Sequence, residues 1–304
     1  MSTLGNLYSQ LFGLEKVTLL RSYYELCKPN VVYMMLICAF VGMLLAEESV
    51  SSFGYLFVSL TGIACCAASA AAVNQVIDRN TDASMTRTDQ RPLPQGELSP
   101  THASLFALII GILGALILYL YVNTLTMILT LASLVGYAFI YTVYLKRATP
   151  QNIVIGGLAG AAPPLLGWSS ISNSIDPHAL LLVLIIFVWT PPHFWALAIY
   201  RKDEYAKESI PMLPVTHGVT FTKLQIVLYT IILFIVSMLP YVVLMSGEIY
   251  LYSALILSTI FLYYSINLYF SNDDEDAMKT FQFSIYYIFL IFLALLIDHF
   301  LISS

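Results

Sequence analysis

Residues 53–82 read FGYLFVSLTGIACCAASAAAVNQVIDRNTD, an apolar run that ends in an amide and two carboxylates. No charged residue precedes Asp78 in this run, so it is long enough to cross a membrane, and its acids begin where such a helix would reach water. Positions four and eight residues apart share one face of a helix. We therefore expect Asn74, Asp78 and Asp82 to form a ladder of oxygen ligands.

Such a ladder is suited to a hard divalent cation. Mg²⁺ prefers carboxylate oxygen, keeps several waters, and couples one or two carboxylates to substrate phosphates. Mg²⁺ is thus the expected metal, with Asp78 and Asp82 as charged ligands and Asn74 as a neutral one. A solvated helix end is the alternative, but Asn74 precedes the first charge, where an isolated amide in lipid is costly.

The composition indicates a membrane protein. The 304 residues are 59% hydrophobic and 10% charged, against about 25% charged residues in soluble domains. Mean hydropathy is +0.81. Because long apolar runs satisfy their own backbone in lipid only as helices, we predict an all-α polytopic protein with one domain over residues 1–304. We expect about nine spans, near 31–46, 53–77, 103–122, 124–145, 153–171, 178–200, 224–245, 249–270 and 280–301.

The basic residues predict the orientation. All 13 Lys and Arg fall on one side of a nine-span arrangement, and the loops on the other side contain none. The positive-inside rule then places the N-terminal segment 1–29 and the loops 78–101 and 201–222 in the cytoplasm, with the C-terminus outside. The net charge of −5 says little about partners, and no nucleic-acid partner is expected.

The two long cytoplasmic loops resemble each other. Residues 87–94 read RTDQRPLP and residues 200–214 read YRKDEYAKESIPMLP. Each loop therefore contains acidic and basic residues and ends in a motif with two prolines. If the second and sixth spans lie side by side, both acidic sites face one cavity. Two carboxylate clusters with bases between them suit a polyanion that arrives with its own metal ions, such as a diphosphate ester.

A diphosphate leaves when metal ions and cationic side chains stabilise the charge on its oxygens. Asp203, with Glu204, would hold a second metal. Five basic residues are candidates to meet the phosphate oxygens: Arg87, Arg91, Lys146, Arg147 and Lys202. Lys146 and Arg147 could instead serve only as a topology anchor.

Several motifs resemble the UbiA-type intramembrane prenyltransferases over nearly the whole chain. They are Asn-x3-Asp-x3-Asp at 74–82, Arg87 to Pro94, YTVYLKR at 141–147, the glycine- and proline-rich run 152–168, PPHFW at 191–195, and Tyr200 to Pro214. The first motif marks the superfamily, and the last three resemble its haem-modifying branch. One departure is visible: the family often has glycine where Ser209 stands, so the loop conformation there is not implied by the resemblance.

The resemblance implies nine transmembrane helices around a central cavity that opens laterally to lipid. It implies transfer of the farnesyl group of farnesyl diphosphate to a vinyl group of haem b, with addition of water and release of diphosphate. Asn74, Asp78, Asp82 and Asp203 would serve Mg²⁺ and diphosphate. The implied location is a bacterial inner membrane, and the expected partners are lipid and a downstream haem-modifying enzyme or terminal oxidase assembly.

His193 lies inside a span, where its imidazole could ligate or orient haem iron; a hydrogen-bonded contact between helices is the alternative. The glycines Gly156, Gly157 and Gly160 are expected to let helices approach closely, and Pro163-Pro164 to kink or end a helix.

Two other functions stay open from the residues. One is a UbiA-type enzyme with an aromatic or quinone-precursor acceptor, which the PPHFW motif disfavours. The other is a transporter of divalent cations or organic anions. Transporters place their polar site near the bilayer midplane, whereas here the acids gather at one membrane face.

Overall fold

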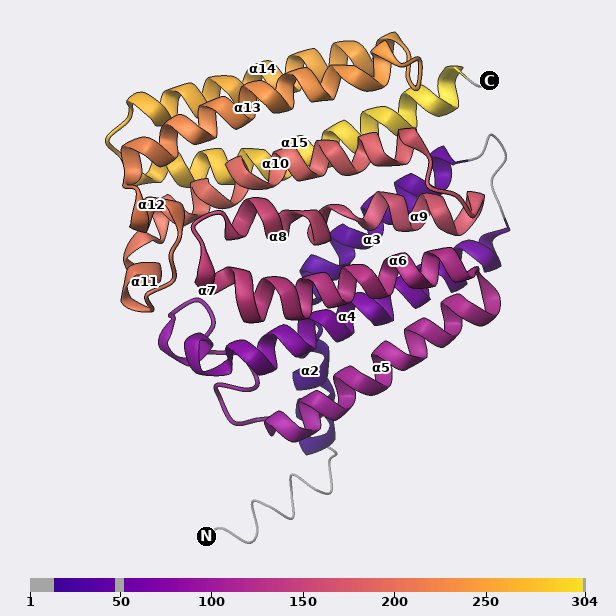
Figure 1. Ribbon diagram of the computed structural model, residues 1–304, viewed down its shortest axis with the longest axis vertical. Coiled ribbons are helices and arrows are strands. Elements are labelled where there is room, and N and C mark those ends of the chain that lie inside the picture. Colours follow the sequence, from indigo (N-terminus) through magenta and orange to yellow (C-terminus); the bar gives the residue numbers. More distant parts are fainter. Residues whose placement is uncertain (1–13, 47–51, 303–304) are drawn as a thin grey trace, which may run out of the picture.

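The computed structural model describes residues 14–46 and 52–302, and over these ranges the regular structure is entirely helical (Figure 1). The first half contains α2 (Leu14–Leu26), α3 (Pro29–Leu45), α4 (Phe53–Ser84), α5 (Pro100–Tyr121), α6 (Thr124–Val135), η1 (Gly136–Leu145) and α7 (Lys146–Ala148). The second half contains α8 (Asn152–Ala161), α9 (Pro163–Ser172), α10 (Pro177–Tyr200), α11 (Lys202–Lys207), α12 (Leu213–Thr216), α13 (Val219–Val242), α14 (Glu248–Phe270) and α15 (Asp274–Ile302). The prediction of an all-α protein is confirmed.

The number of membrane spans also agrees with the prediction. Among the described residues, eight helical segments are long and apolar enough to cross a membrane. A ninth results if Leu19–Leu26 and Pro29–Leu45 are counted as one span bent by 50°. Because α3 has only 17 residues, it lies at the short end of what a bilayer requires.

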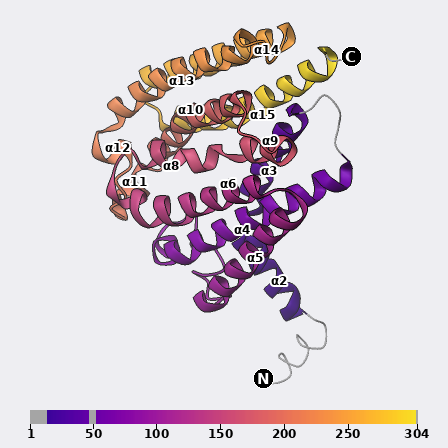
Figure 2. The ribbon, with the colours of Figure 1, turned by 45° about the vertical axis from the view of Figure 1, so that its right-hand side comes forward.

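The long helices lie in rows, from α14 and α13 through α10 and α15 to α4 and α5, and this order persists when the molecule is turned (Figures 1 and 2). Direct packing joins α4 to α5, α3 to α9, and α10 to both α13 and α15. The short helices α7, α11 and α12 all lie on the left-hand side of Figure 1, as does the turn-rich segment that follows α4. The segments rich in acids and bases therefore share one side of the helical layer.

Two proline pairs have different effects. The pair Pro163-Pro164 starts a new helix, so the fifth predicted span is divided into α8 and α9 at Ala162, as expected. The pair Pro191-Pro192 lies inside α10 without ending it.

The fourth predicted span contains an irregularity that its sequence did not reveal. It begins as α6, continues through the ten-residue π-helix η1, and ends in α7. The Thr142 hydroxyl donates to the carbonyl of Tyr137 at 2.8 Å, five residues back along this wider helix. The π-helix therefore sets which side chains at the end of this span face the interior.

Glycine determines how closely α3 and α9 pack. A Cβ on Gly167 would overlap the backbone carbonyl of Ala39, and a Cβ on Gly42 would overlap that of Pro164. Such glycine contacts let transmembrane backbones meet directly. The sequence did not single out these two positions.

The close-approach prediction for α8 is confirmed in part. A Cβ on Gly156 would overlap the Tyr141 ring, and one on Gly157 would press on Thr190. Gly160 has open space around it, so the expectation of close packing is wrong there.

The Gly167→Ala variant is expected to be destabilised by about 1–3 kcal/mol, because the new methyl group would force α9 away from α3. Gly160→Ala is the matched control, since the same methyl group meets no atom within 4 Å there and helix propensity favours alanine. Thermal unfolding of both variants in the same detergent tests this. Equal melting temperatures would contradict the proposed backbone contact.

Candidate active site

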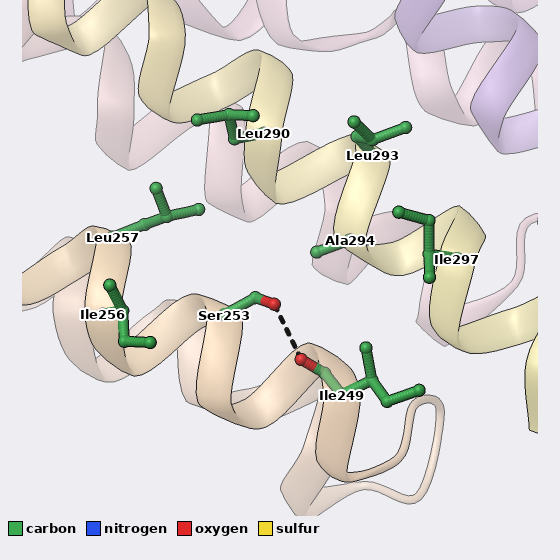
Figure 3. Close-up of a pocket in the computed structure, with 8 residues that line it drawn as sticks. All are labelled: Ile249, Ser253, Ile256, Leu257, Leu290, Leu293, Ala294 and Ile297. Atoms are coloured by element: carbon green, nitrogen blue, oxygen red, sulfur yellow. Dashed lines mark hydrogen bonds between the residues drawn. The ribbon is translucent and has the colours of Figure 1, made fainter.

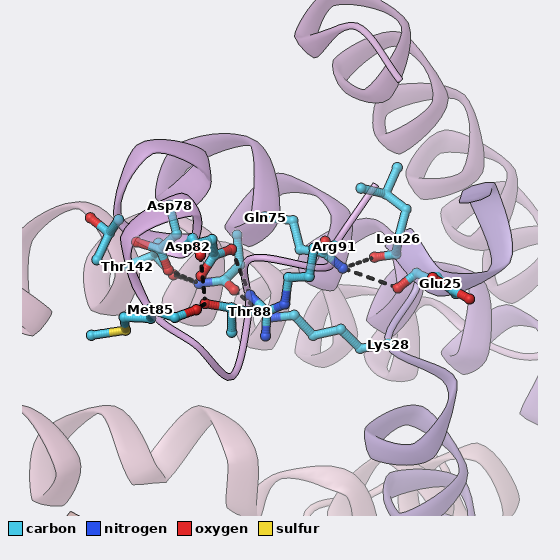
Figure 4. A network of polar contacts seen from close by, with 12 residues as sticks. Glu25, Leu26, Lys28, Gln75, Asp78, Asp82, Met85, Thr88, Arg91 and Thr142 are labelled. Carbon is cyan, nitrogen blue, oxygen red and sulfur yellow. Dashed lines mark hydrogen bonds and ion pairs between the residues drawn. The ribbon is translucent and has the colours of Figure 1, made fainter. Parts of the chain in front are cut away.

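The predicted oxygen ladder lies on one buried face of α4. Asn74, Asp78 and Asp82 are 4%, 3% and 4% exposed. All three belong to a single uninterrupted helix, because α4 continues beyond its apolar run. Figure 4 shows Asp78 and Asp82 between Thr142 and Arg91. The spacing argument is therefore correct about the shared face, and the structure adds that this face is turned inward.

Each carboxylate is paired with a cation from another segment. The Lys146 Nζ atom, on α7, lies 2.7 Å from Asp78 Oδ2. The Arg91 Nη1 atom, from the segment after α4, lies 2.6 Å from Asp82 Oδ2. A buried charge without a partner is strongly unfavourable, so these pairs allow both acids to be ionised inside the fold.

The π-helix supplies the opposite wall of the site. Asn74 Nδ2 donates to Thr142 Oγ1 and to Asp78 Oδ2, both at 3.0 Å. Arg147, which follows Lys146, donates from Nη2 to Thr81 Oγ1 at 2.9 Å. Two of the predicted phosphate-binding residues therefore reach α4 directly, which is more than a topology anchor requires.

A third cation, Lys28, enters the site from the break between α2 and α3. Its backbone is left-handed, with φ of 51°, and its Nζ donates to Asn74 Oδ1. Gln75, the buried neighbour of Asn74, holds this break by donating from Nε2 to the carbonyls of Glu25 and Leu26 at 3.1 and 3.0 Å. Figure 4 shows Lys28, Gln75, Glu25 and Leu26 beside Arg91.

The position of Lys28 lowers the pKa of its ammonium group. Removal of the ammonium from water lowers the pKa of Lys28 to about 7, and the nearby charge of Arg91 acts in the same direction, against Asp82 and Asp78. A phosphate placed between Lys28 and Arg91 would relieve this repulsion. Four basic residues, Lys28, Arg91, Lys146 and Arg147, therefore surround the two acids of the ladder.

The sequence analysis did not include Lys28 among the site residues. A signal was present, because Lys28 directly precedes Pro29 at the start of the first span and belongs to the same side as the other basic residues. Nothing in the sequence, however, indicates a left-handed residue there, and that conformation directs its side chain to α4.

The second acidic cluster is organised differently. Asp203 is exposed at the start of α11, while Glu204 Oε1 lies 2.7 Å from Arg201 Nη1. Lys202 is half-buried, and Ser209 has a φ of 53°, a left-handed conformation that favours the glycine common in the family. The serine thus keeps the loop geometry that glycine would permit.

The two loops meet through apolar contacts. Met85, just after α4, belongs to the same buried cluster as Tyr205 and Ile210 of the second loop. Burial raises the pKa of Tyr205, and the charges of Arg87 and Arg201 oppose this rise, so Arg87 lies within electrostatic reach of the second loop. Arg87 itself is exposed.

The spans that precede these loops are not direct neighbours. Over the described residues, α4 packs on η1, η1 on α8, and α8 on α10, while α4 and α10 share no substantial interface. The condition that the second and sixth spans lie side by side is therefore not met. The loops come together beyond the ends of the spans instead.

Comparison with known proteins identifies the family to which the chain belongs. The model of the UbiA prenyltransferase family matches residues 35–296. The chain belongs to the UbiA prenyltransferase family. It is 58% identical to the Protoheme IX farnesyltransferase 2 of Pseudoalteromonas atlantica, over 92% of both chains. It is also 58% identical to a Protoheme IX farnesyltransferase of Legionella pneumophila, over 92% of this chain and 95% of that one.

Solved structures share the UbiA fold. A structure from work on digeranylgeranylglyceryl phosphate synthase superposes with a TM-score of 0.77 at 20% identity, covering 93% of this chain and 99% of that one. A UbiA homologue from Archaeoglobus fulgidus, bound to DMAPP and Mg²⁺, superposes with a TM-score of 0.65 at 17% identity, covering 90% and 99%.

The donor set of this UbiA member fits Mg²⁺. Asp78 and Asp82 each use Oδ2 for a cation, and neither Oδ1 atom has a partner or is sealed from solvent in the described structure. No group of three or more His, Cys, Asp or Glu residues in the described ranges forms a complete protein cage. An incomplete set of oxygen ligands is what Mg²⁺ uses when waters and substrate phosphates complete its shell.

His193 makes the helix-to-helix contact that was the alternative to haem ligation. Its Nδ1 lies 2.6 Å from Ser284 Oγ of α15, and its ring stacks on Trp189 and Phe281 with centroids 4.2 and 4.6 Å apart. This contact engages only one ring nitrogen. It is therefore compatible with a second role for the other nitrogen.

A separate groove lies between the first half of α14 and the second half of α15 (Figure 3). Its lining is aliphatic apart from Ser253, whose hydroxyl donates to the Ile249 carbonyl at 2.8 Å. It presents no charge for a diphosphate and no ligand for haem iron. The groove is therefore no part of the acidic site.

Thr142→Val is expected to destabilise the protein by about 1–3 kcal/mol, because the buried Asn74 amide loses an acceptor that water cannot replace. Thr142→Ser keeps the hydroxyl and should stay close to wild type. Thermal unfolding in matched detergent measures both. A valine variant as stable as the serine variant would show that this hydrogen bond does not hold α4 to η1.

Proposed function

We infer that this protein transfers the farnesyl group of farnesyl diphosphate to a vinyl group of haem b, with addition of water, and releases haem O and diphosphate. The observation that carries this function is the 58% identity to protohaem IX farnesyltransferases over 92% of the chain. The UbiA family match and the inward-facing ladder on α4 agree with it. Haem is a substrate of this reaction.

The reaction breaks the bond between the farnesyl carbon and a diphosphate oxygen. One vinyl carbon of haem forms the new carbon–carbon bond, the oxygen of water bonds to the other vinyl carbon, and one proton of that water is released. Negative charge grows on the departing diphosphate, so fixed cations stabilise the transition state. Lys28, Arg91, Lys146 and Arg147 surround the ladder and are proposed to bind the phosphate oxygens.

We propose that Asn74, Asp78 and Asp82 hold Mg²⁺ on the ladder, and that Asp203 and Glu204 serve a second metal with Arg87 and Lys202 nearby. When bound, Mg²⁺ neutralises phosphate charge and makes diphosphate a better leaving group. The ion pairs of Asp78 and Asp82 hold their carboxylates in place before substrate arrives. A diphosphate that enters with its metal then meets both signs of charge within one site.

We propose that His193 binds the haem substrate through its iron. Its position inside α10, with only Nδ1 engaged in a hydrogen bond in the described structure, supports this role. A site from which water is excluded would also shield a farnesyl cation from premature reaction with water.

We propose that the ladder and the loops face the cytoplasm of a bacterium whose inner membrane holds the protein. The basic residues near the span ends on that side support this orientation. The product would pass to a haem-modifying enzyme or to the assembly of a terminal oxidase.

Product analysis tests the function directly. Purified protein in nanodiscs, supplied with haem b, farnesyl diphosphate and Mg²⁺, is expected to yield a hydroxyethylfarnesyl haem by mass spectrometry. Folded protein that farnesylates an aromatic acceptor but leaves haem unmodified would overturn the inference.

Asp78→Asn is expected to lower kcat/KM by about 100-fold or more, because the ladder loses a charged ligand where charge develops. Asp274→Asn, at an exposed position on α15, is the control and should retain wild-type activity. Steady-state rates at saturating Mg²⁺ check both. Equal activity of the two variants would remove Asp78 from the proposed mechanism.

Lys28→Met is expected to raise the KM for farnesyl diphosphate about tenfold, since a charged hydrogen bond to phosphate is worth about 1.5–3 kcal/mol. Lys28→Arg should recover part of this loss, and Lys279→Met, on an exposed turn of α15, should have no effect. Kinetics with varied farnesyl diphosphate at fixed haem provide the measurement. A changed KM for haem alone would contradict the assignment of Lys28 to diphosphate.

A further inference from the structure

The contact between His193 and Ser284 indicates which nitrogen of the imidazole carries the proton. Ser284 is fully buried on α15, and its Oγ makes two short contacts of 2.6 Å. One contact is with His193 Nδ1, and the other is with the backbone carbonyl of Phe281. A carbonyl can only accept, so the serine proton must point at Phe281.

This assignment determines the tautomer of His193. A hydroxyl has one proton, and Ser284 has already used it on the Phe281 carbonyl. With the serine proton on Phe281, the hydrogen bond between Nδ1 and Ser284 Oγ is made by a proton on Nδ1. In neutral imidazole a proton on Nδ1 leaves Nε2 with a free lone pair.

Aromatic rings surround the imidazole of His193. Trp189 and Phe281 stack against the imidazole and make no ring contact with each other among the described aromatics, so they cover opposite faces. Nε2 has no hydrogen-bond partner in the described structure, and it is not completely buried. Phe194 meets the ring edge-on with centroids 4.9 Å apart and His193 is 8% exposed, so Nε2 is the one ring nitrogen left for a ligand.

We propose that Ser284 is a positioning residue for the haem substrate: by accepting the Nδ1 proton of His193, it presents Nε2 to the haem iron. The proposal rests on the proposed haem transferase function and deepens it. Histidines that bind metals commonly donate their other nitrogen to a fixed acceptor, which sets ring orientation and raises ligand basicity.

The hydroxyl of Ser284 can be removed without losing the main link between the helices. Trp189 Nε1 donates to the backbone carbonyl of Ser284 at 2.8 Å, and this bond does not need the side chain. Ser284→Ala therefore changes the acceptor of the imidazole proton while α10 and α15 stay joined. Ser284→Thr restores a hydroxyl at the same position.

A matched control exists elsewhere in the bundle. Ser265 on α14 is also fully buried, and its hydroxyl lies 2.9 Å from that of Thr230 on α13. Ser265→Ala removes a comparable buried hydrogen bond between helices without touching His193. Any effect common to both alanine variants is structural.

The first experiment reads the tautomer without haem or substrate. Full-length protein with ¹⁵N-labelled histidine, in nanodiscs, is examined by magic-angle-spinning NMR, and the His193 signals are assigned among five histidines with His193→Ala. We expect a protonated Nδ1 and an unprotonated Nε2 in wild type and Ser265→Ala, with the other tautomer appearing in Ser284→Ala. A proton on Nε2 in wild type would overturn the proposal.

The second experiment titrates the same nanodiscs with haem b alone, with empty nanodiscs as the blank. The Soret spectrum is expected to show histidine ligation in wild type and to lose it in His193→Ala. Ser284→Ala should bind haem about tenfold more weakly, the lower end of the range for lost outer hydrogen bonds, and Ser284→Thr should regain most of the affinity.

The outcomes separate this proposal from the reaction itself. If Ser284→Ala matches wild type in affinity and spectrum while His193→Ala does not, Ser284 has no positioning role. If His193→Ala also binds haem with an unchanged spectrum, His193 is no ligand and the proposal fails. In either case, formation of hydroxyethylfarnesyl haem by wild type would leave the transferase function standing.

Discussion

Two carboxylates buried near the end of a membrane-crossing helix are costly by several kcal/mol each unless cations meet them. Asp78 and Asp82 are in this position, and Lys146 and Arg91 meet them at 2.7 and 2.6 Å. The two cations come from α7 and from the segment that follows α4, so the chain must fold both segments onto one face of α4. The architecture of the acidic end of the protein follows from this requirement.

Backbone irregularities occur where these partners must be delivered. Lys28 is left-handed at the break between α2 and α3, and the π-helix η1 leads into Lys146. Gln75 secures the first irregularity by binding the last carbonyls of α2. Unusual backbone that points side chains into a functional site is a recurring arrangement, because regular helices alone rarely converge several charges on one point.

The fold separates two kinds of chemistry. Charge is concentrated around the inner face of α4. Around His193, by contrast, the interface of α10 with α15 is aromatic. Such a division suits a reaction that joins a charged diphosphate ester to a flat hydrophobic porphyrin. The apolar groove between α14 and α15 takes part in neither.

The amino-acid sequence by itself determined the membrane-embedded helical class, the approximate spans and the shared face of Asn74, Asp78 and Asp82. These properties depend on local composition and on the periodicity of one helix, which a sequence displays directly. It also identified Lys146 and Arg91 as candidate site cations, though not the carboxylate that each one meets. The role of Asp203 stays a prediction, since its side chain is exposed.

Only the tertiary structure decided which residues from different helices come together. Lys28 reaches Asn74 through a left-handed backbone, Thr142 through a π-helix, and Ser284 reaches His193 across the contact of α10 with α15. It also showed that α4 and α10 are separated by η1 and α8, although their loops meet. The physical reason is that periodicity along one helix reports which face is buried, whereas the neighbour on that face is set by the packing of the whole bundle.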